Sequence, residues 1–427
     1  MANIMTLPVD EKIHKATNTL AENMSDEINL INVLPPEQSE GMEIGKEFLE
    51  AVHFYDYKNR LLRSNKNDSP VCGMEVWYED NTVKFMFYTP DKDIEKEYRQ
   101  QLTGYYPECE ITQQTDNEGM FIETESDKTE TISVIQFQLK EHYFLPLANP
   151  NSEDNELDSD PFKRIINEID TKDDTRLMIQ YLYQPAPYNW TEGNYDDLEV
   201  KAKKIQNKGG FKTRFGGFKI DEVDDPGIYE TAASEMRSRL NQSSYYLNIR
   251  LAVICSGETE EKAERKTKMR VKSVVNTLEH LYTTKAGQKL VPKKYRFNKE
   301  SKTKKLLVDM IERNPTHMKR PRHFYDVYWQ RITPNYDTMI LTTGELAGHI
   351  HLPSPDDVNT GAIKFKSDMV SGEVPPDVDD FEPVSKEERT GYTDEELRNL
   401  SEETEQEEYN SDSDDSNPST LFDNEGD

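Results

Sequence analysis

The sequence predicts an α+β protein built from two ferredoxin-like lobes, each an antiparallel sheet with helices on one face. Short β-rich runs alternate with segments of helical apolar spacing, and turn residues join neighbouring runs. A strand–strand–helix–strand order appears early in the chain, and a later helix, strand and long helix repeat the rhythm.

Composition changes along the chain set the expected domain boundaries. The first lobe is expected over residues 46–206 and the second over residues 228–355, with a Gly/aromatic/basic hinge at 207–227 between them. Residues 1–45 are polar and expected to be largely flexible. Residues 356–427 are rich in Asp, Glu, Ser and Pro, which predicts a disordered acidic tail.

In the first lobe, VCGMEVWY and TVKFMFY at 71–78 and 82–88 are joined by a short polar turn and predict a hairpin. Asp91 is placed to cap a helix over residues 92–102. Later segments are expected to be a strand at 109–112, a strand or bent pair at 132–145, a helix at 162–169 and a strand at 176–183.

In the second lobe, a helix is expected at 228–240, a strand at 245–255 and a long helix at 258–283. Apolar residues recur along that long helix at three- and four-residue spacing, which indicates one face turned to a core. They are Ala263, Val271, Val274, Val275, Leu278 and Leu281.

The net charge of −30 is unevenly distributed. Residues 371–427 carry −18, whereas residues 259–331 hold 20 Lys and Arg against 8 Asp and Glu. These two regions can attract each other or each can meet a different partner. Acidic surfaces also suit a high-salt host, although the many lysines fit an extreme halophile poorly.

The three cysteines are few, odd in number and set in apolar runs, which predicts buried thiols in a reducing compartment. The first residues lack the pattern of a signal peptide. The longest apolar run, at 245–255, is too short to span a bilayer. We therefore expect a cytoplasmic protein without direct membrane insertion, associated with a membrane only through a partner.

Sequence motifs for catalysis are absent. A Walker A loop requires Gly-Lys-Ser/Thr, but Gly45-Lys46 is followed by Glu47 and no such tripeptide occurs. No Gly-x-Ser-x-Gly elbow is present. His349 and His351 form the only close histidine pair, and two histidines at a helix end explain them better than a metal site. We expect no enzyme activity, no cofactor and no metal.

The basic region offers candidate contacts to nucleic acid, because clustered Lys and Arg can neutralise phosphates. The alternative is a solvated helix face, partly paired with neighbouring glutamates. The candidate nucleic-acid residues are Lys266, Arg270, Lys293, Lys294, Arg296, Arg320 and Arg322.

Two passages together resemble a known family. Residues 69–111 pair a hairpin with a helix, and residues 339–353 read MILTTGELAGHIHLP. Both are similar to the region that precedes the motor in conjugation-type, HerA/FtsK-class ATPases of type IV secretion-like systems. In that family a similar phrase commonly closes the N-terminal domain. The matching residues are Ile340, Leu341, Thr342, Glu345, Leu346, Ala347, His351 and Pro353, while Gly344 replaces the usual second acidic residue.

The resemblance implies two α+β lobes that dock a DNA-translocase motor to its assembly platform. Because the chain continues into an acidic tail where that family has a motor, it implies a plasmid- or virus-borne archaeal adaptor. The partner is then a Walker A-containing motor ATPase or a secretion platform protein on another chain. The alternative is a nucleic-acid-binding protein of a plasmid or virus.

The candidate docking segment is residues 339–353, in which Thr342 or Thr343 is placed to cap a short helix with Glu345 near capping-box spacing. Pro353 is expected to end that helix. The candidate docking residues are Leu341, Glu345, Leu346, Ile350 and His351. The alternative is that this segment only closes the core of the second lobe.

Overall fold

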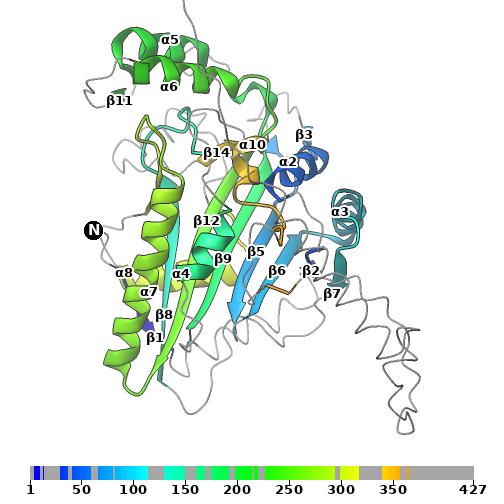
Figure 1. The fold of residues 1–427 in the computed structure, drawn as a ribbon, viewed down its shortest axis with the longest axis vertical. Helices are drawn as coiled ribbons and strands as arrows, with labels where there is room; N and C mark the ends of the chain where they lie inside the picture. The colour runs from blue at the N-terminus through cyan, green and yellow to red at the C-terminus, as the bar shows by residue number, and fades with distance from the viewer. Residues whose placement is uncertain are drawn as a thin grey trace, which may run out of the picture. The chain divides into compact units, whose positions relative to one another are not determined.

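The fold is given by a computed structural model (Figure 1). It describes residues 4–9, 13, 29–36, 41–58, 66–79, 82–113, 129–149, 160–168, 175–191, 198–213, 216–219, 227–293, 299–316, 339–355 and 363–364. Apart from residues 363–364, the predicted acidic tail lies outside these ranges.

A ten-stranded antiparallel sheet forms the centre of the fold, in the order β1-β8-β12-β9-β5-β6-β2-β7 (Figure 1). β13 also pairs with β8, and β14 pairs with β12. The strands are β1 Leu7–Pro8, β2 Asn29–Leu34, β5 Cys72–Glu79, β6 Thr82–Thr89, β7 Glu110–Gln113, β8 Thr129–Leu139, β9 Thr175–Pro185, β12 Ser244–Gly257, β13 Leu290–Pro292 and β14 Met339–Thr342.

β12 is the central strand and is buried along almost its whole length. One side of β12 pairs with β9, from Tyr245 to Cys255. The other side is shared, because β8 pairs with its second half and β14 with its first four residues. A strand buried on both faces needs an almost continuous apolar run, and YYLNIRLAVIC supplies one.

One face of the sheet carries most of the helices and the larger hydrophobic core. α7 packs on β8 and β12 through its buried row, and its N-cap Thr259 accepts a hydrogen bond from the Lys262 amide. Asp91 caps α3 in the same way through the Ile94 amide. The helices of this face are α2 Met42–Ala51, α3 Lys92–Tyr105, α4 Pro161–Glu168, α7 Glu260–Leu281 and α10 Thr343–Ala347.

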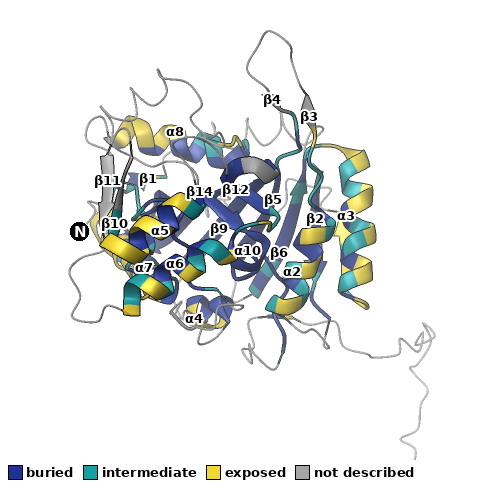
Figure 2. Ribbon diagram, turned by 90° about the horizontal axis from the view of Figure 1, so that it is seen from above, coloured by how far each residue is buried: buried dark blue, intermediate teal, exposed yellow. Residues whose placement is uncertain are grey.

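The second face is covered by α8 (Lys299–Ile311), which lies on the opposite side of the sheet from α4 and α7 (Figure 2). Its apolar residues Leu306, Leu307, Met310 and Ile311 join a separate cluster with side chains that point to this face of the strands. Trp77 and Met178 are among those strand residues. Alternate residues along the central strands β5, β6, β8, β9 and β12 therefore serve two different cores.

Two further helices pack against each other above one end of the sheet (Figure 1). α5 (Leu198–Lys208) and α6 (Gly227–Ser238) are linked through the hairpin of β10 (Gly210–Thr213) and β11 (Gly216–Lys219). Shorter elements are η1 Tyr188–Thr191 and the pair β3 Tyr57–Lys58 and β4 Lys66–Asn67.

The α+β class is confirmed, as are the hairpin of β5 and β6, helices α3 and α7, and the strand β12. The division into two ferredoxin-like lobes is not confirmed. β12 comes from the predicted second lobe, yet it pairs with β8 and β9 of the first in the same sheet. The one-face arrangement of helices is wrong, because α8 covers the second face.

The structure also contains ordered strands within two expected connecting segments. Residues 1–45 are expected to be largely flexible, but β2 pairs with both β6 and β7 inside the sheet. Leu30, Ile31 and Val33 on β2 are buried, so this short strand is held by the cores on both faces. The expected hinge at 207–227 contains the β10–β11 hairpin.

Cys72 and Cys255 are buried free thiols, as predicted, and Cys109 is a partly buried free thiol. Burial raises the pKa of Cys72 to about 12, which keeps its thiol protonated at neutral pH. None of the helices in the described ranges combines the length and the apolar character needed to cross a bilayer.

Candidate functional site

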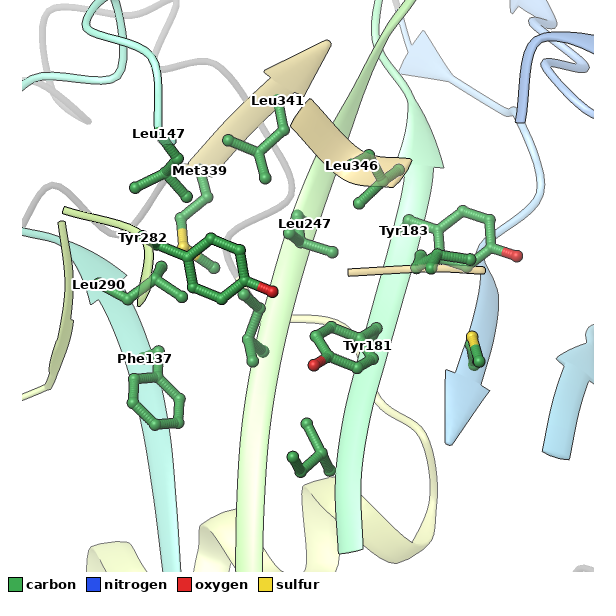
Figure 3. Close-up of a cluster of buried hydrophobic side chains, with 14 of the residues drawn as sticks. Phe137, Leu147, Tyr181, Tyr183, Leu247, Tyr282, Leu290, Met339, Leu341 and Leu346 are labelled. Carbon is green, nitrogen blue, oxygen red and sulfur yellow. The ribbon is translucent and has the colours of Figure 1, made fainter. Parts of the chain in front are cut away.

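Residues 339–353, here called the closing segment, form β14, α10 and the turn after them. β14 extends the sheet beside the first part of β12, where Leu247 pairs with Met339 and Ser244 with Thr342. Met339, Leu341 and Leu346 point into a cluster of buried side chains from β9, β12 and the end of α7 (Figure 3). At least one side of the closing segment is therefore part of the larger hydrophobic core.

Glu345 makes the capping box that the spacing predicts. The Thr342 amide donates to Glu345 Oε2 at 2.8 Å, and the Glu345 amide donates to Thr342 Oγ1 at 3.4 Å. Glu345 Oε1 accepts a third bond, from the Leu147 amide at 2.9 Å. A buried carboxylate is thus surrounded by donors from two separate parts of the chain.

Arg239, which follows α6, balances the charge of Glu345. Its Nε lies 3.0 Å from Glu345 Oε2, and both side chains are 2% exposed. Arg239 also donates to the carbonyl oxygens of Tyr143 and Ile340, and its guanidinium lies 4.9 Å from the centre of the Trp190 ring. Burial lowers the pKa of Arg239, while Glu345 opposes that shift.

His351 forms a second buried polar contact, with Asp160. His351 Nε2 lies 2.9 Å from Asp160 Oδ2, and Nδ1 lies 2.8 Å from the Ala347 carbonyl oxygen. The other carboxylate oxygen of Asp160 accepts from the Phe162 amide at 2.7 Å, at the start of α4. Asp160 therefore fixes the first turn of α4 to the end of the closing segment.

The surroundings of Asp160 favour the ionised form of its carboxyl group. Burial alone raises the pKa of Asp160, but His351 and the two backbone amides outweigh it and leave this pKa below its ordinary value. The carboxylate is then ionised and only accepts, as does the Ala347 carbonyl. The hydrogen in the contact between His351 Nδ1 and the Ala347 carbonyl oxygen therefore belongs to the ring nitrogen.

His349 lies between these contacts with a different environment. Its ring stacks on Tyr282 at a centroid distance of 4.0 Å, and neither ring nitrogen has a hydrogen-bond partner among the described residues. Burial, together with the charge of His351, lowers the pKa of His349 to about 3. His349 is therefore a neutral aromatic core residue at physiological pH.

All five candidate docking residues lie in this buried closing segment. Leu341, Glu345, Leu346, Ile350 and His351 are each no more than 2% exposed. The structure brings them together, but as parts of the core rather than as an exposed surface. This placement favours the alternative in which the segment closes the core, and the docking role stays a prediction.

Of the seven candidate nucleic-acid residues, Lys266, Arg270 and Lys293 lie in the described part of the chain. Lys266 and Arg270 flank the outer side of α7, and Lys293 follows β13 beside β8, where its amide donates to the Gln136 carbonyl. α8, the next helix with several basic residues, lies across the sheet from α7 (Figure 2). Lys294, Arg296, Arg320 and Arg322 lie outside the described residues.

A row of polar residues across the second face was not expected from the sequence. Gln136, Arg250, Gln180 and Glu75 are direct cross-strand neighbours on β8, β12, β9 and β5. Gln180 donates to Glu75 Oε1 at 2.8 Å, and Arg313 approaches the same carboxylate at 2.9 Å. Polar residues that interrupt apolar strands, such as Arg250, are the signal that could have revealed it.

This polar row holds the end of α8 and the residues after it. Arg250 donates to the Asp309 carbonyl at 2.7 Å, and Gln180 donates to the Met310 carbonyl at 2.8 Å. Asn248 exchanges hydrogen bonds with the backbone of Thr316. The row satisfies carbonyls that a helix leaves free at its C-terminus.

The buried polar side chains described above therefore each have an evident packing or hydrogen-bonding task. Among the described residues, no group of three or more His, Cys, Asp or Glu side chains is arranged to hold a metal ion.

Fold and site together define an α+β protein with one large antiparallel sheet, closed at one end by a buried, ionically fastened segment. The chain belongs to the family described as Domain of unknown function (DUF8128), whose model matches residues 6–364. The match spans every strand of the large sheet and ends just after the closing segment. No curated protein matches the sequence at a significant level.

Proposed function

We propose that this protein is a non-catalytic adaptor of a DNA-translocase or type IV secretion-like machine. In this proposal it acts in the cytoplasm, uses no cofactor and docks a motor ATPase, carried on another chain, to its assembly platform. A plasmid or virus of an archaeon is the expected source.

The main observation in support of the proposal is that the closing segment holds the end of the folded body in place. The residues that match the pre-motor phrase of HerA/FtsK-class ATPases are the ones that fasten this fold. Thr342 and Glu345 form the capping box, and His351 pairs with Asp160. In the family that it resembles, this phrase closes the N-terminal domain, and the same position here supports the proposal.

The geometry limits how such an adaptor could dock. Because the side chains of Leu341, Leu346 and Ile350 are buried, a partner could reach them only if the segment left the core. Removing these apolar side chains from the core would cost several kcal/mol, roughly 1.5–3 for each. Docking through an exposed face of the intact fold avoids this loss of free energy and is therefore favoured.

A pull-down of the tagged full-length protein from native cells, with and without nuclease, tests the proposal. We expect a Walker A-containing ATPase to be recovered in both arms. Contacts through protein surfaces survive nuclease, whereas contacts bridged by DNA do not. Recovery of no such ATPase in either arm would contradict the adaptor.

The nuclease arm also tests the alternative function in nucleic-acid binding. If every partner disappears after nuclease treatment, the basic residues of α7 and of residues 293–331 become the first place to seek phosphate contacts. Binding that weakens steeply with salt would then support the alternative.

A further inference from the structure

The outer face of α7 combines charge and apolar surface in a short section. Between Arg265 and Lys272 the sequence holds five basic residues and no acidic one. Arg265, Lys268, Met269 and Lys272 are exposed on this face, at the spacing of residues that share one side of a helix. The opposite side, including Val271 and Val274, is buried against the sheet.

Met269 lies at the centre of this section and is 63% exposed. Among the described residues only Val200 is another large hydrophobic residue with such exposure. Methionine is adaptable and is enriched at protein interfaces, as arginine is. An apolar centre ringed by charged residues is the usual layout of a small contact surface.

The helix presents this section rigidly. Thr267, on the inner side of the same two turns, contacts Thr131 Oγ1 at 2.8 Å and donates to the Thr131 carbonyl at 3.1 Å. Val271 and Val274 anchor the next turn in the core. A surface that is already ordered loses little conformational entropy when a partner binds.

Two of its cations are available without breaking an existing ion pair. Lys268 pairs with Glu264, four residues before it on the same helix. Arg265 and Lys272, in contrast, make no ion pair with any residue in the described part of the chain. Both side chains are exposed, so they are accessible to a partner.

The length of this basic section favours a short acidic protein segment over a nucleic-acid backbone as its anionic partner. Arg265 to Lys272 spans about 10 Å along the helix axis. Glu260, Glu261 and Glu264 precede this section and Glu279 follows it. A nucleic-acid backbone laid along α7 would meet those carboxylates, whereas a short acidic segment that crosses the middle of the helix would not.

We propose that the outer face of α7, from Arg265 to Lys272, docks an acidic protein segment that carries one apolar anchor residue. The anchor packs on Met269, and flanking carboxylates pair with Arg265 and Lys272. This inference rests on the proposed adaptor function, for which it names the docking surface and the chemistry of the partner.

The test is a titration of the full-length protein with a fluorescein-labelled peptide in which Leu-Phe is flanked by Asp and Glu, followed by fluorescence anisotropy. Two reference probes are the same peptide with Ser-Ser in place of Leu-Phe, and oligo-dT. The variants are Arg265→Glu/Lys272→Glu and Met269→Ser. The matched control is Lys92→Glu/Lys96→Glu, an equal charge change on the exposed side of α3.

We expect the Leu-Phe peptide to bind the natural protein more tightly than either reference probe. Arg265→Glu/Lys272→Glu should weaken this binding about tenfold or more, because two attractive contacts become repulsive. Met269→Ser should weaken it about threefold and remove the preference for Leu-Phe. The α3 control should leave it unchanged.

Absence of saturable peptide binding, or binding that the α7 variants do not weaken, overturns the proposal. Tighter binding of oligo-dT, lost in the α7 variant, overturns it in favour of a phosphate-binding face. The pull-down distinguishes failure of this docking surface from failure of the adaptor function. If both the natural protein and the α7 variant recover the motor ATPase, the adaptor function is supported and the docking role of this surface is contradicted.

Discussion

Glu345 shows how a single charged residue can be an integral part of an apolar core. Its carboxylate is surrounded by the Thr342 and Leu147 amides and by the guanidinium of Arg239. Removing one partner of such a buried pair costs about 3–5 kcal/mol, because the other charge is left uncompensated. The pair thus ties α10, the residues after α6 and the segment before α4 into one unit.

His349 provides a prediction about pH at the same scale. Its pKa is about 3 in the folded protein, against an ordinary value of 6.5. Below pH 6.5 the unfolded chain takes up a proton that the folded chain refuses, so falling pH favours unfolding. We expect this residue to reduce the free energy of unfolding by about 1.4 kcal/mol per pH unit between roughly pH 6 and 3.

Urea denaturation of the natural protein and of His349→Phe across this pH range measures the effect. The difference between the two stability curves should have the slope given above, since phenylalanine cannot be protonated. His280→Gln, a change on the exposed side of the last turn of α7, is the control for replacing a histidine outside the core. Parallel curves for His349→Phe and the natural protein would show that His349 is not the buried neutral group described here.

At the scale of elements, α2 packs against the closing segment through a glycine. A Cβ atom on Gly45 would lie 2.7 Å from His351 Cβ and 3.0 Å from the Ile350 carbonyl oxygen. We expect Gly45→Ala to destabilise the fold by about 1–3 kcal/mol through overpacking, although alanine is the better helix former.

Gly104, near the end of α3, is the matched control, because a Cβ atom there would meet nothing within 4 Å. Gly104→Ala should stabilise the protein by roughly 0.5–1 kcal/mol, through helix propensity alone. Thermal or urea unfolding of both variants measures these effects. Two changes of the same sign would mean that α2 can move away from His351 at little cost.

Local sequence signals predict helices α3 and α7 correctly. Strand β2 is ordered by pairing with distant segments, which local signals do not reveal. Asp91 and the apolar row of α7 are local features, and both helices are confirmed. β2 is a short strand in a polar region, and it is ordered by β6 and β7, which lie far along the chain. The apolar pairs of α8, Leu306–Leu307 and Met310–Ile311, did carry a helical signal.

The same distinction applies to the closing segment. The three-residue spacing of Thr342 and Glu345 predicts a capping box, and the structure confirms it. Arg239 and Asp160 are more than a hundred residues away from their partners, so no local pattern could assign them. Without these partners, the sequence alone predicts Glu345 and His351 as candidate docking residues.

At the scale of the whole molecule, the position of β12 means that the two predicted lobes share one sheet. β12 comes from the second range, but its neighbours β8 and β9 come from the first. Its side chains also fill both cores, with Leu251 in the larger one and Ala252 in the smaller one. Neither range can bury its strands without the other.

We therefore expect the folded part of the chain to unfold in one cooperative transition. A fragment of residues 46–206 should show no such transition, because β8 and β9 would each lose their pairing with β12.

In the full-length protein, Leu251→Ala should lower the melting temperature seen by tryptophan fluorescence and by circular dichroism equally. Trp77 and Trp190 lie in the first range and Trp329 lies in the second. The measurement therefore uses a Trp329→Phe background, in which the fluorescence reports on the first range although the change is in the second. Leu→Ala at a buried site costs about 2–5 kcal/mol, enough to shift the transition clearly. Two separate transitions, or a cooperative melt of the fragment alone, would instead support two independent lobes.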